Sequence, residues 1–141
     1  MSVSLGEWKS MREINYWAVL LAAIAAFVLS TGWYIGFAKQ RAQLSPAAAT
    51  DMRKPQPVKM GLEIARNIVL ALVLAYFLSR LRITGWPGAI KFALIAWLGF
   101  PFLLLTGSVL WENVPPKLAA IHAGDWLLKL LVMSVILCRW R

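Results

Sequence analysis

The chain has 141 residues, of which 60% are hydrophobic and 15% are charged, with 15 lysines and arginines against 6 aspartates and glutamates. Soluble proteins average roughly 45–50% apolar and about 25% charged residues, so this composition excludes a soluble globular domain and a disordered chain alike. We expect a single membrane domain over residues 1–141, and no nucleic-acid partner for the +9 net charge, because the basic residues do not line one helical face.

Four continuous apolar stretches define the predicted elements. In chain order they cover residues 16–37, 62–78, 89–110 and 117–140. Each reaches the roughly 17–25 residues that a helix needs to cross a hydrocarbon core of about 30 Å. The stretches lack the alternation typical of barrel strands, and most connections between them are short. The predicted fold is therefore all-α: an integral membrane, antiparallel four-transmembrane-helix bundle.

The connection over residues 38–61 is the one long loop. It contains three prolines and five basic residues, which are Lys39, Arg41, Arg53, Lys54 and Lys59. This composition predicts a flexible loop on a headgroup surface, where each basic side chain contributes roughly 1 kcal/mol near anionic lipid. We therefore expect the anionic headgroups of the bilayer to be the partner of these five residues.

Small residues and one proline bear on how the helices pack. Two pairs of small residues are spaced by four, a pattern that favours close helix contact: Gly32 with Gly36, and Ala120 with Gly124. Pro101 lies inside the third span and is expected to bend it. Tryptophans near the span ends predict aromatic belts, with Trp17, Trp86 and Trp140 on one side and Trp33 and Trp111 on the other.

The distribution of basic residues gives no orientation by the positive-inside rule. The face with both termini and the face with the long loop each carry seven basic residues, and the fifteenth, Lys129, lies inside a span. The dense cluster of the long loop, next to the first helix, favours a cytoplasmic loop. The even balance leaves two alternatives: insertion in both directions with an antiparallel dimer, or an orientation set by neighbouring subunits or the first helix.

Polar residues collect in the membrane half nearest the long loop. They are Ser30, Thr31 and Tyr34, then Glu63, Arg66 and Asn67, then Thr106 and Ser108, and finally His122 and Asp125. The opposite half is almost entirely apolar. Because polar groups in hydrocarbon need partners or water, all four helices are predicted to line a polar pocket. It opens on the loop side and closes near Pro101 and Lys129.

The fourth span carries the strongest candidate site. At about 100° per residue, His122, Asp125 and Lys129 fall within about 60° of one another and share one helix face. Lys129 is twelve residues from both Lys117 and Arg141, which places it near the midplane, about 18 Å from either end. A charge there costs roughly 2.5–3.5 kcal/mol, and the i,i+4 pair with Asp125 offsets part of that cost.

Two interpretations of this face stay open. In the first, Asp125 and Lys129 form a self-neutralised pair that attaches the fourth helix to its neighbours, with Tyr34 or Asn67 completing the hydrogen bonds. In the second, the pair marks a substrate or proton path. The full candidate site comprises His122, Asp125, Lys129, Tyr34, Asn67 and Ser30. Glu63 and Arg66 are expected to form only an interfacial ion pair.

The sequence offers little to an enzyme. Cys138 is the single cysteine and His122 the single histidine, which leaves few ways to build a metal site. Motifs for phosphate loops, zinc proteases and serine hydrolases are missing from the sequence. We expect no catalytic residues, metal or cofactor. The favoured role is a structural or accessory subunit of a homo-oligomer or larger membrane complex, and the alternative is a small transporter or channel that uses Asp125 and Lys129.

Three segments carry a resemblance to a known family: Ile14–Leu20 running on to Gly32-Trp33-Tyr34, then Ala96–Phe100, then Lys117–Gly124. Together they resemble domain of unknown function 1761, a family of small bacterial membrane proteins, over residues 14–140. The resemblance implies a multi-pass protein of the bacterial inner (plasma) membrane and supplies no activity. The chain reads His122-Ala123-Gly124-Asp125 where the family more often has Asn-Ala-Gly-Tyr, and Lys129 is a further departure. The charged face is therefore particular to this protein or to a subgroup.

Overall fold

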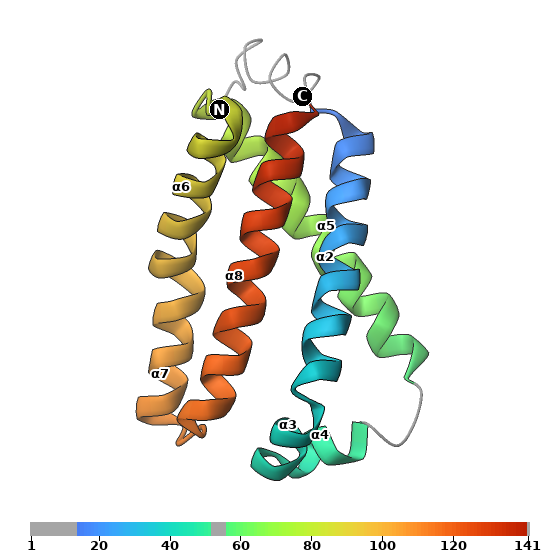
Figure 1. Ribbon diagram of the computed structural model, residues 1–141, viewed down its shortest axis with the longest axis vertical. Coiled ribbons are helices and arrows are strands. Elements are labelled where there is room, and N and C mark those ends of the chain that lie inside the picture. Colours follow the sequence, from blue (N-terminus) through green and yellow to red (C-terminus); the bar gives the residue numbers. More distant parts are fainter. Residues whose placement is uncertain (1–13, 52–55, 141) are drawn as a thin grey trace, which may run out of the picture.

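The structure, a computed structural model, describes residues 14–51 and 56–140, and within these ranges it contains helices and no strand. The predicted all-α fold is confirmed. Four segments are long and apolar enough to cross a membrane, and consecutive segments run in opposite directions (Figure 1). In chain order the helices are α2 (Tyr16–Gly36), α3 (Ala38–Leu44), α4 (Pro46–Asp51), α5 (Pro57–Arg80), α6 (Gly85–Trp97), the π-helix η1 (Leu98–Phe102), α7 (Leu103–Trp111) and α8 (Pro116–Arg139).

The starts of the long helices follow from local sequence. The Asn15 side chain accepts hydrogen bonds from the backbone N–H groups of Trp17 and Ala18, which caps α2. Both α5 and α8 begin with a proline, at positions where the missing N–H would have no helical partner. The second span differs most from its predicted bounds, because α5 begins at Pro57 rather than at residue 62.

The segment between α2 and α5 corrects a prediction. A flexible loop was expected over residues 38–61, but residues 38–44 and 46–51 are helical, and α5 takes over from Pro57. Alanines 47–49 favour helix, and Pro46 occupies the first position of α4. The hydroxyl of Ser45 accepts from the backbone N–H of Ala48 at 3.4 Å. The two short helices lie at the end of the bundle away from the termini (Figure 1).

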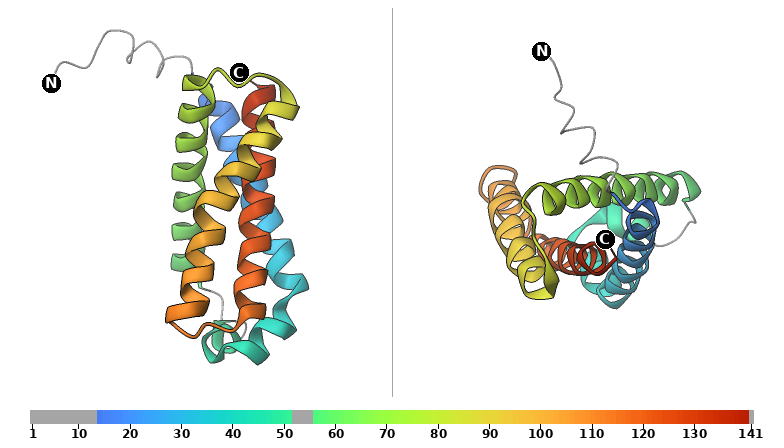
Figure 2. Two further views of the ribbon diagram at one scale, coloured as in Figure 1. Left: turned by 90° about the vertical axis from the view of Figure 1, so that its left-hand side faces the viewer. Right: turned by 90° about the horizontal axis from the view of Figure 1, so that it is seen from above.

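Helix α8 is the centre of the bundle. It packs against α2, α5 and α6, and α2 also packs against α5. The third span, formed by α6, η1 and α7, packs mainly on α8 and is the least buried of the four segments. The view from above in Figure 2 shows α8 among the other three spans.

Pro101 lies inside η1, the π-helical turn of the third span. A proline lacks the N–H of a regular helical turn, and a wide turn is one way for a helix to accommodate it. The span changes direction in this region, as the left view of Figure 2 shows. The bend predicted for Pro101 is therefore present.

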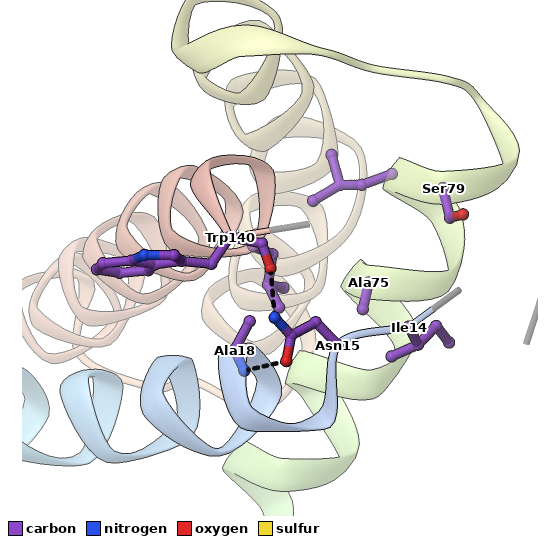
Figure 3. A pocket seen from close by; sticks show the side chains of 8 residues that line it. Ile14, Asn15, Ala18, Ala75, Ser79 and Trp140 are labelled. Atoms are coloured by element: carbon purple, nitrogen blue, oxygen red, sulfur yellow. Dashed lines mark hydrogen bonds between the residues drawn. The ribbon is translucent and has the colours of Figure 1, made fainter. Parts of the chain in front are cut away.

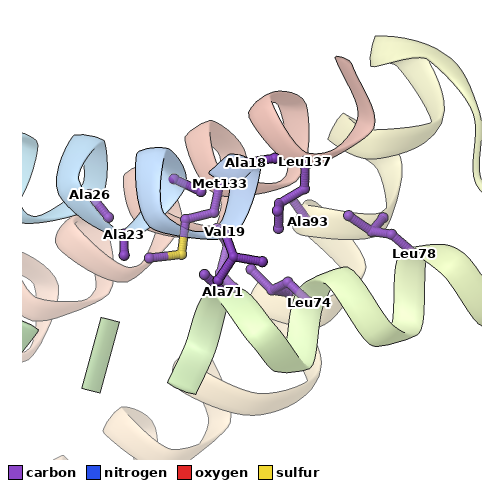
Figure 4. Packing of buried hydrophobic residues seen from close by; sticks show 12 residues of the cluster. Ala18, Val19, Ala23, Ala26, Ala71, Leu74, Leu78, Ala93, Met133 and Leu137 are labelled. Carbon is purple, nitrogen blue, oxygen red and sulfur yellow. The ribbon is translucent and has the colours of Figure 1, made fainter. Parts of the chain in front are cut away.

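The apolar core lies in the half of the bundle that contains the start of α2 and the end of α8, and Figure 4 shows how its side chains pack. Small side chains on α2 face leucines on α5 and α8, and Met133 fills the space between them. Alanines permit close approach of the helices, which replaces the hydrophobic effect as the source of packing energy in a membrane. The buried members are Ala18, Val19, Ala22, Ala23, Ala26, Ala71, Leu74, Leu78, Ala93, Leu130, Met133 and Leu137.

The start of α2 and the end of α8 meet at one face of the bundle, which we call the terminal face. The amide of Asn15 that caps α2 also donates from Nδ2 to the carbonyl oxygen of Trp140, at 2.9 Å (Figure 3). The small cavity beside it has a volume of about 20 Å³ and is lined by Ala75 and Ser79 of α5. This is space for about one water molecule.

Two indoles attach α8 to its neighbours. Trp33 of α2 donates from Nε1 to the carbonyl oxygen of Ile121 at 2.9 Å, and Trp97 of α6 donates to that of Ala123 at 2.8 Å. The Trp33 ring lies against Gly124, where an added Cβ would be 2.5 Å from Cζ2. Trp33 therefore packs between helices and is not part of an aromatic belt.

The other small residues predicted for helix packing do not pack within the chain. Gly32 and Gly36 are exposed, and a Cβ added at either would meet nothing within 4 Å. Ala120 is also exposed. The prediction is therefore wrong for these three residues as contacts within the described chain, and Gly124 alone of the four allows a close helix approach.

Candidate functional site

A network of charged side chains joins three of the spans in the membrane half next to α3. Lys129 of α8 places Nζ 2.7 Å from Oε1 of Glu63 on α5 and 3.1 Å from Oδ2 of Asp125, one turn earlier on α8. The side chains of Lys129 and Asp125 are 5% and 3% exposed, and that of Glu63 is 28% exposed. Lys129 thus contacts two carboxylates, although only its pair with Asp125 was predicted.

Asp125 extends the network to α2. Its Oδ1 accepts a short hydrogen bond from the hydroxyl of Ser30, and its Oδ2 accepts one from the hydroxyl of Tyr34 at 3.3 Å. The Tyr34 oxygen also lies 2.8 Å from Nδ1 of His122. A tyrosine hydroxyl has one hydrogen, so when it donates to Asp125 it accepts from a protonated Nδ1. Five of the six predicted site residues therefore meet in one network.

A cavity of about 1090 Å³ opens beside this network. It is lined by residues of α2, α3, α5 and α8, and Lys129 is the lining residue furthest along α8. The predicted polar pocket next to the 38–61 segment is thus present, but the third span takes no part in it. Thr106 donates its hydroxyl hydrogen to the carbonyl of Phe102 on its own helix, and neither Ser108 nor Pro101 lines the cavity. The expectation that all four helices contribute is wrong.

The reason for this error lies in the direction of each helix face. Counting residues from the ends of each span placed Thr106 and Ser108 at the same membrane depth as the other polar residues. The third span, however, packs mainly on α8, away from α2 and α5. A polar residue at the right depth can satisfy its hydroxyl on its own helix, as Thr106 does.

Two arginines line the cavity. Arg41 of α3 lines the cavity and stacks over the Tyr34 ring, with Cζ 4.3 Å from the ring centroid. Arg66 forms the expected ion pair with Glu63, at 2.8 Å. Lys59 also lines the cavity. Of the five residues predicted to bind headgroups, Arg41 and Lys59 thus face the cavity, Lys39 is exposed on α3, and Arg53 and Lys54 lie outside the described residues.

Glu63 and Arg41 belong to the site but were not among the six residues predicted for it. Because α5 begins five residues earlier than predicted, Glu63 lies inside the helix, about 9 Å from its start, rather than at its entrance. Burying the charge of Lys129 is costly, and two carboxylates offset that cost better than one. This cost is the feature of the sequence that could have indicated Glu63 as a second partner of Lys129. Arg41 was assigned to a loop, and its place on the short helix α3 is what directs it to the cavity.

Asn67 departs from its predicted role. It was expected to complete the hydrogen bonds of the Asp125–Lys129 pair, but it is 2% exposed and its Nδ2 has no hydrogen-bond partner among the described residues. It lines a second hollow of about 440 Å³ between α5 and α8. Tyr34, not Asn67, completes the network.

The unpartnered amide leads to a prediction about stability. Replacing Asn67 by leucine is expected to raise the free energy of unfolding in detergent by about 1 kcal/mol, because a buried donor without a partner costs roughly 1–3 kcal/mol. The check is a thermal unfolding curve of purified protein. Replacing Ser30 by alanine serves as the comparison, because it removes a hydroxyl that is bonded to Asp125 and should lower stability. Equal losses for both variants would contradict the assignment of Asn67.

The arrangement suits binding through charge and hydrogen bonds. In the part of the chain that the structure describes, no three histidine, cysteine, aspartate or glutamate side chains converge to hold a metal ion. The site offers a buried carboxylate, Asp125, and a half-buried one, Glu63, both already paired, together with the arginines that line the cavity.

A family model described as "Protein of unknown function (DUF1761)" matches residues 17–138 of the chain. The chain therefore belongs to the DUF1761 family, as the three resembling segments suggested. No curated protein and no solved structure matches the chain.

Proposed function

We propose that this member of the DUF1761 family is a multi-pass protein of the bacterial inner membrane that binds a small molecule in the cavity without transforming it, as an accessory subunit of a homo-oligomer or larger assembly. The observation that carries this proposal is the cavity of about 1090 Å³ with charged walls from α2, α3, α5 and α8. Its size reaches the upper end of the roughly 300–1,000 Å³ typical of ligand sites.

The half of the bundle beyond Lys129 is packed, which supports binding of a molecule rather than its passage through the protein. Beyond Lys129 the bundle is filled by the alanine and leucine core, and the small cavity at the terminal face is only about 20 Å³. A transported molecule would need a second conformation that opens this packed half. Because the network of Lys129, Glu63 and Asp125 is already satisfied, it serves first to hold α2, α5 and α8 together around the cavity.

A specific observation favours the alternative of a small transporter or channel. Side chains that carry exchangeable protons lie in an unbroken series: His122 contacts Tyr34, Tyr34 contacts Asp125, Asp125 contacts Lys129, and Lys129 contacts Glu63. Such a series is typical of proton relays in membrane proteins. In this alternative the series couples substrate movement to protons.

The binding proposal predicts that a small molecule stays bound to the protein during purification. Purification in mild detergent, followed by mass spectrometry, should find one molecule in stoichiometric amount with the wild-type chain. Thr31→Trp should lose it, because Thr31 lines the cavity and an indole there would fill it. Val28→Trp should keep it, because Val28 lies one turn away on α2, is exposed and does not line the cavity.

Proton flux distinguishes the alternative. The protein is reconstituted in vesicles that contain pyranine, and a potassium diffusion potential drives protons inward. We expect acidification no faster than in empty vesicles. Two results together would overturn the binding proposal in favour of transport. The first is faster acidification that Tyr34→Phe abolishes, and the second is wild-type protein that purifies with no molecule in its cavity. Tyr34→Phe suits this test because it removes only the hydroxyl that joins His122 to Asp125.

A further inference from the structure

The cavity holds more positive charge than its own carboxylates neutralise. Three of its cations, Arg41, Arg66 and Lys129, stand beside two carboxylates, Glu63 and Asp125, which leaves an excess of +1 among these five residues with His122 neutral. The two carboxylates are engaged by Lys129 and Arg66.

Arg41 is the cation that most needs a counter-ion. It stacks on Tyr34, no ion pair with it occurs among the described residues, and its buried Nε has no hydrogen-bond partner there. A guanidinium presents several N–H donors in one plane, which matches the oxygens of a phosphate or carboxylate. The cavity therefore favours an anionic group placed against Arg41.

An apolar groove adjoins the cavity. It has a volume of about 440 Å³ between α5 and α8, and its walls include Leu62, Val69 and Val73. Arg66 and Lys129 line both hollows. From Leu62 to Val73 the groove follows about 16 Å of helix, which is close to half of the hydrocarbon core of about 30 Å. It thus spans the depth of one leaflet.

We infer that the ligand is an anionic lipid, with its phosphate among the cations of the cavity and one acyl chain in the groove between α5 and α8. This inference rests on the proposed binding function and names its ligand class. Basic pockets between membrane helices bind anionic headgroups. A zwitterionic lipid would leave the charge excess in place, and a soluble anion would leave the groove without an occupant.

The test compares three probes that share parts of this ligand. The full chain, freed of lipid in detergent, is titrated with dioleoylphosphatidylglycerol, dioleoylphosphatidylcholine or glycerol 3-phosphate, and bound molecules are counted by native mass spectrometry. We expect one phosphatidylglycerol to bind at least about fivefold more tightly than phosphatidylcholine, since the excess charge at Arg41 favours a ligand with net negative charge. Glycerol 3-phosphate is expected to bind at least about tenfold more weakly than phosphatidylglycerol, because it buries no acyl chain.

Matched variants separate headgroup from tail. Arg41→Gln should weaken the binding of phosphatidylglycerol about tenfold. Arg80→Gln is the control and should leave that binding unchanged. Arg80 also lies over a tyrosine ring, that of Tyr76, but near the opposite end of the bundle. Val69→Trp should weaken it by obstructing the groove. Ile64→Trp is the control, because Ile64 is exposed on α5 and lines neither hollow. Arg66→Gln gives a second headgroup variant if Arg41→Gln fails to fold.

Three results would overturn the inference. Equal binding of the two phospholipids would mean ordinary annular lipid. Binding of glycerol 3-phosphate as tight as that of phosphatidylglycerol would assign the cavity to a soluble anion; the lipid inference would then fail while the proposed binding function stood. Probe affinities that neither Arg41→Gln nor Val69→Trp changes would remove the cavity from binding and overturn both.

Discussion

Replacing Lys129 by methionine is expected to lower the free energy of unfolding in detergent by about 3 kcal/mol, the low end of the cost of breaking a buried ion pair from one side. Lys129 is the cation that contacts Glu63 and Asp125 deep in the bundle. Without it, Asp125 keeps its bonds to Ser30 and Tyr34, but its buried charge loses the one ion pair that it forms among the described residues. Thermal unfolding of the purified protein measures the loss.

The control and the rescue make this prediction specific. Lys117→Met changes the same residue type on the same helix, but Lys117 is exposed in the first turn of α8, so we expect a change within about 0.5 kcal/mol. Adding Asp125→Asn and Glu63→Gln to Lys129→Met should recover part of the loss, because coupled residues are not additive. A triple variant as unstable as the sum of the singles would contradict the network.

Replacing Gly124 by alanine is expected to cost about 1–2 kcal/mol of unfolding free energy. The new Cβ would lie 2.5 Å from Cζ2 of Trp33 and 3.0 Å from Cη2, so the indole has to move. Overpacking of this kind typically costs about 1–3 kcal/mol, and the better helix propensity of alanine offsets part of it. Movement of the ring also endangers the hydrogen bond from Trp33 to Ile121.

Gly32→Ala is the matched control for Gly124→Ala. It makes the same substitution in a membrane span, but nothing lies within 4 Å of the added Cβ. We expect the stability to stay level or to rise by up to about 1 kcal/mol. If thermal unfolding shows the same loss for both glycines, the contact of Trp33 with Gly124 does not limit the packing of α2 on α8.

Periodicity and depth predicted much of this molecule. Apolar runs of sufficient length identify the four spans, and the spacing of His122, Asp125 and Lys129 places them on one face of α8, next to the cavity. These predictions succeed because they depend on one helix at a time. Polar residues at one depth also indicated which half of the bundle holds the cavity.

The errors concern relations between helices. Glu63 reaches Lys129 because of the way α5 crosses α8. Asn67 lies one helical turn further along α5, in the groove, and its Nδ2 has no hydrogen-bond partner among the described residues. Residue depth in one helix does not show which of its side chains meets Lys129, because that depends on how α5 crosses α8. The 38–61 segment failed for a different reason: its prolines suggested a loop, but Pro46 and Pro57 stand at helix starts, where proline is tolerated.

The two indole hydrogen bonds determine the axial register of α8. Ile121 and Ala123 are two residues apart and therefore lie about 200° apart around the helix, so α2 and α6 hold α8 from different sides. A slip by one residue would translate α8 by about 1.5 Å and rotate it by about 100°. Both indoles would then lose their carbonyl oxygens together, and Lys129 would turn away from Glu63. Trp33 and Trp97 thus fix the axial position and the rotation of α8, which keeps the charged face of α8 next to the cavity.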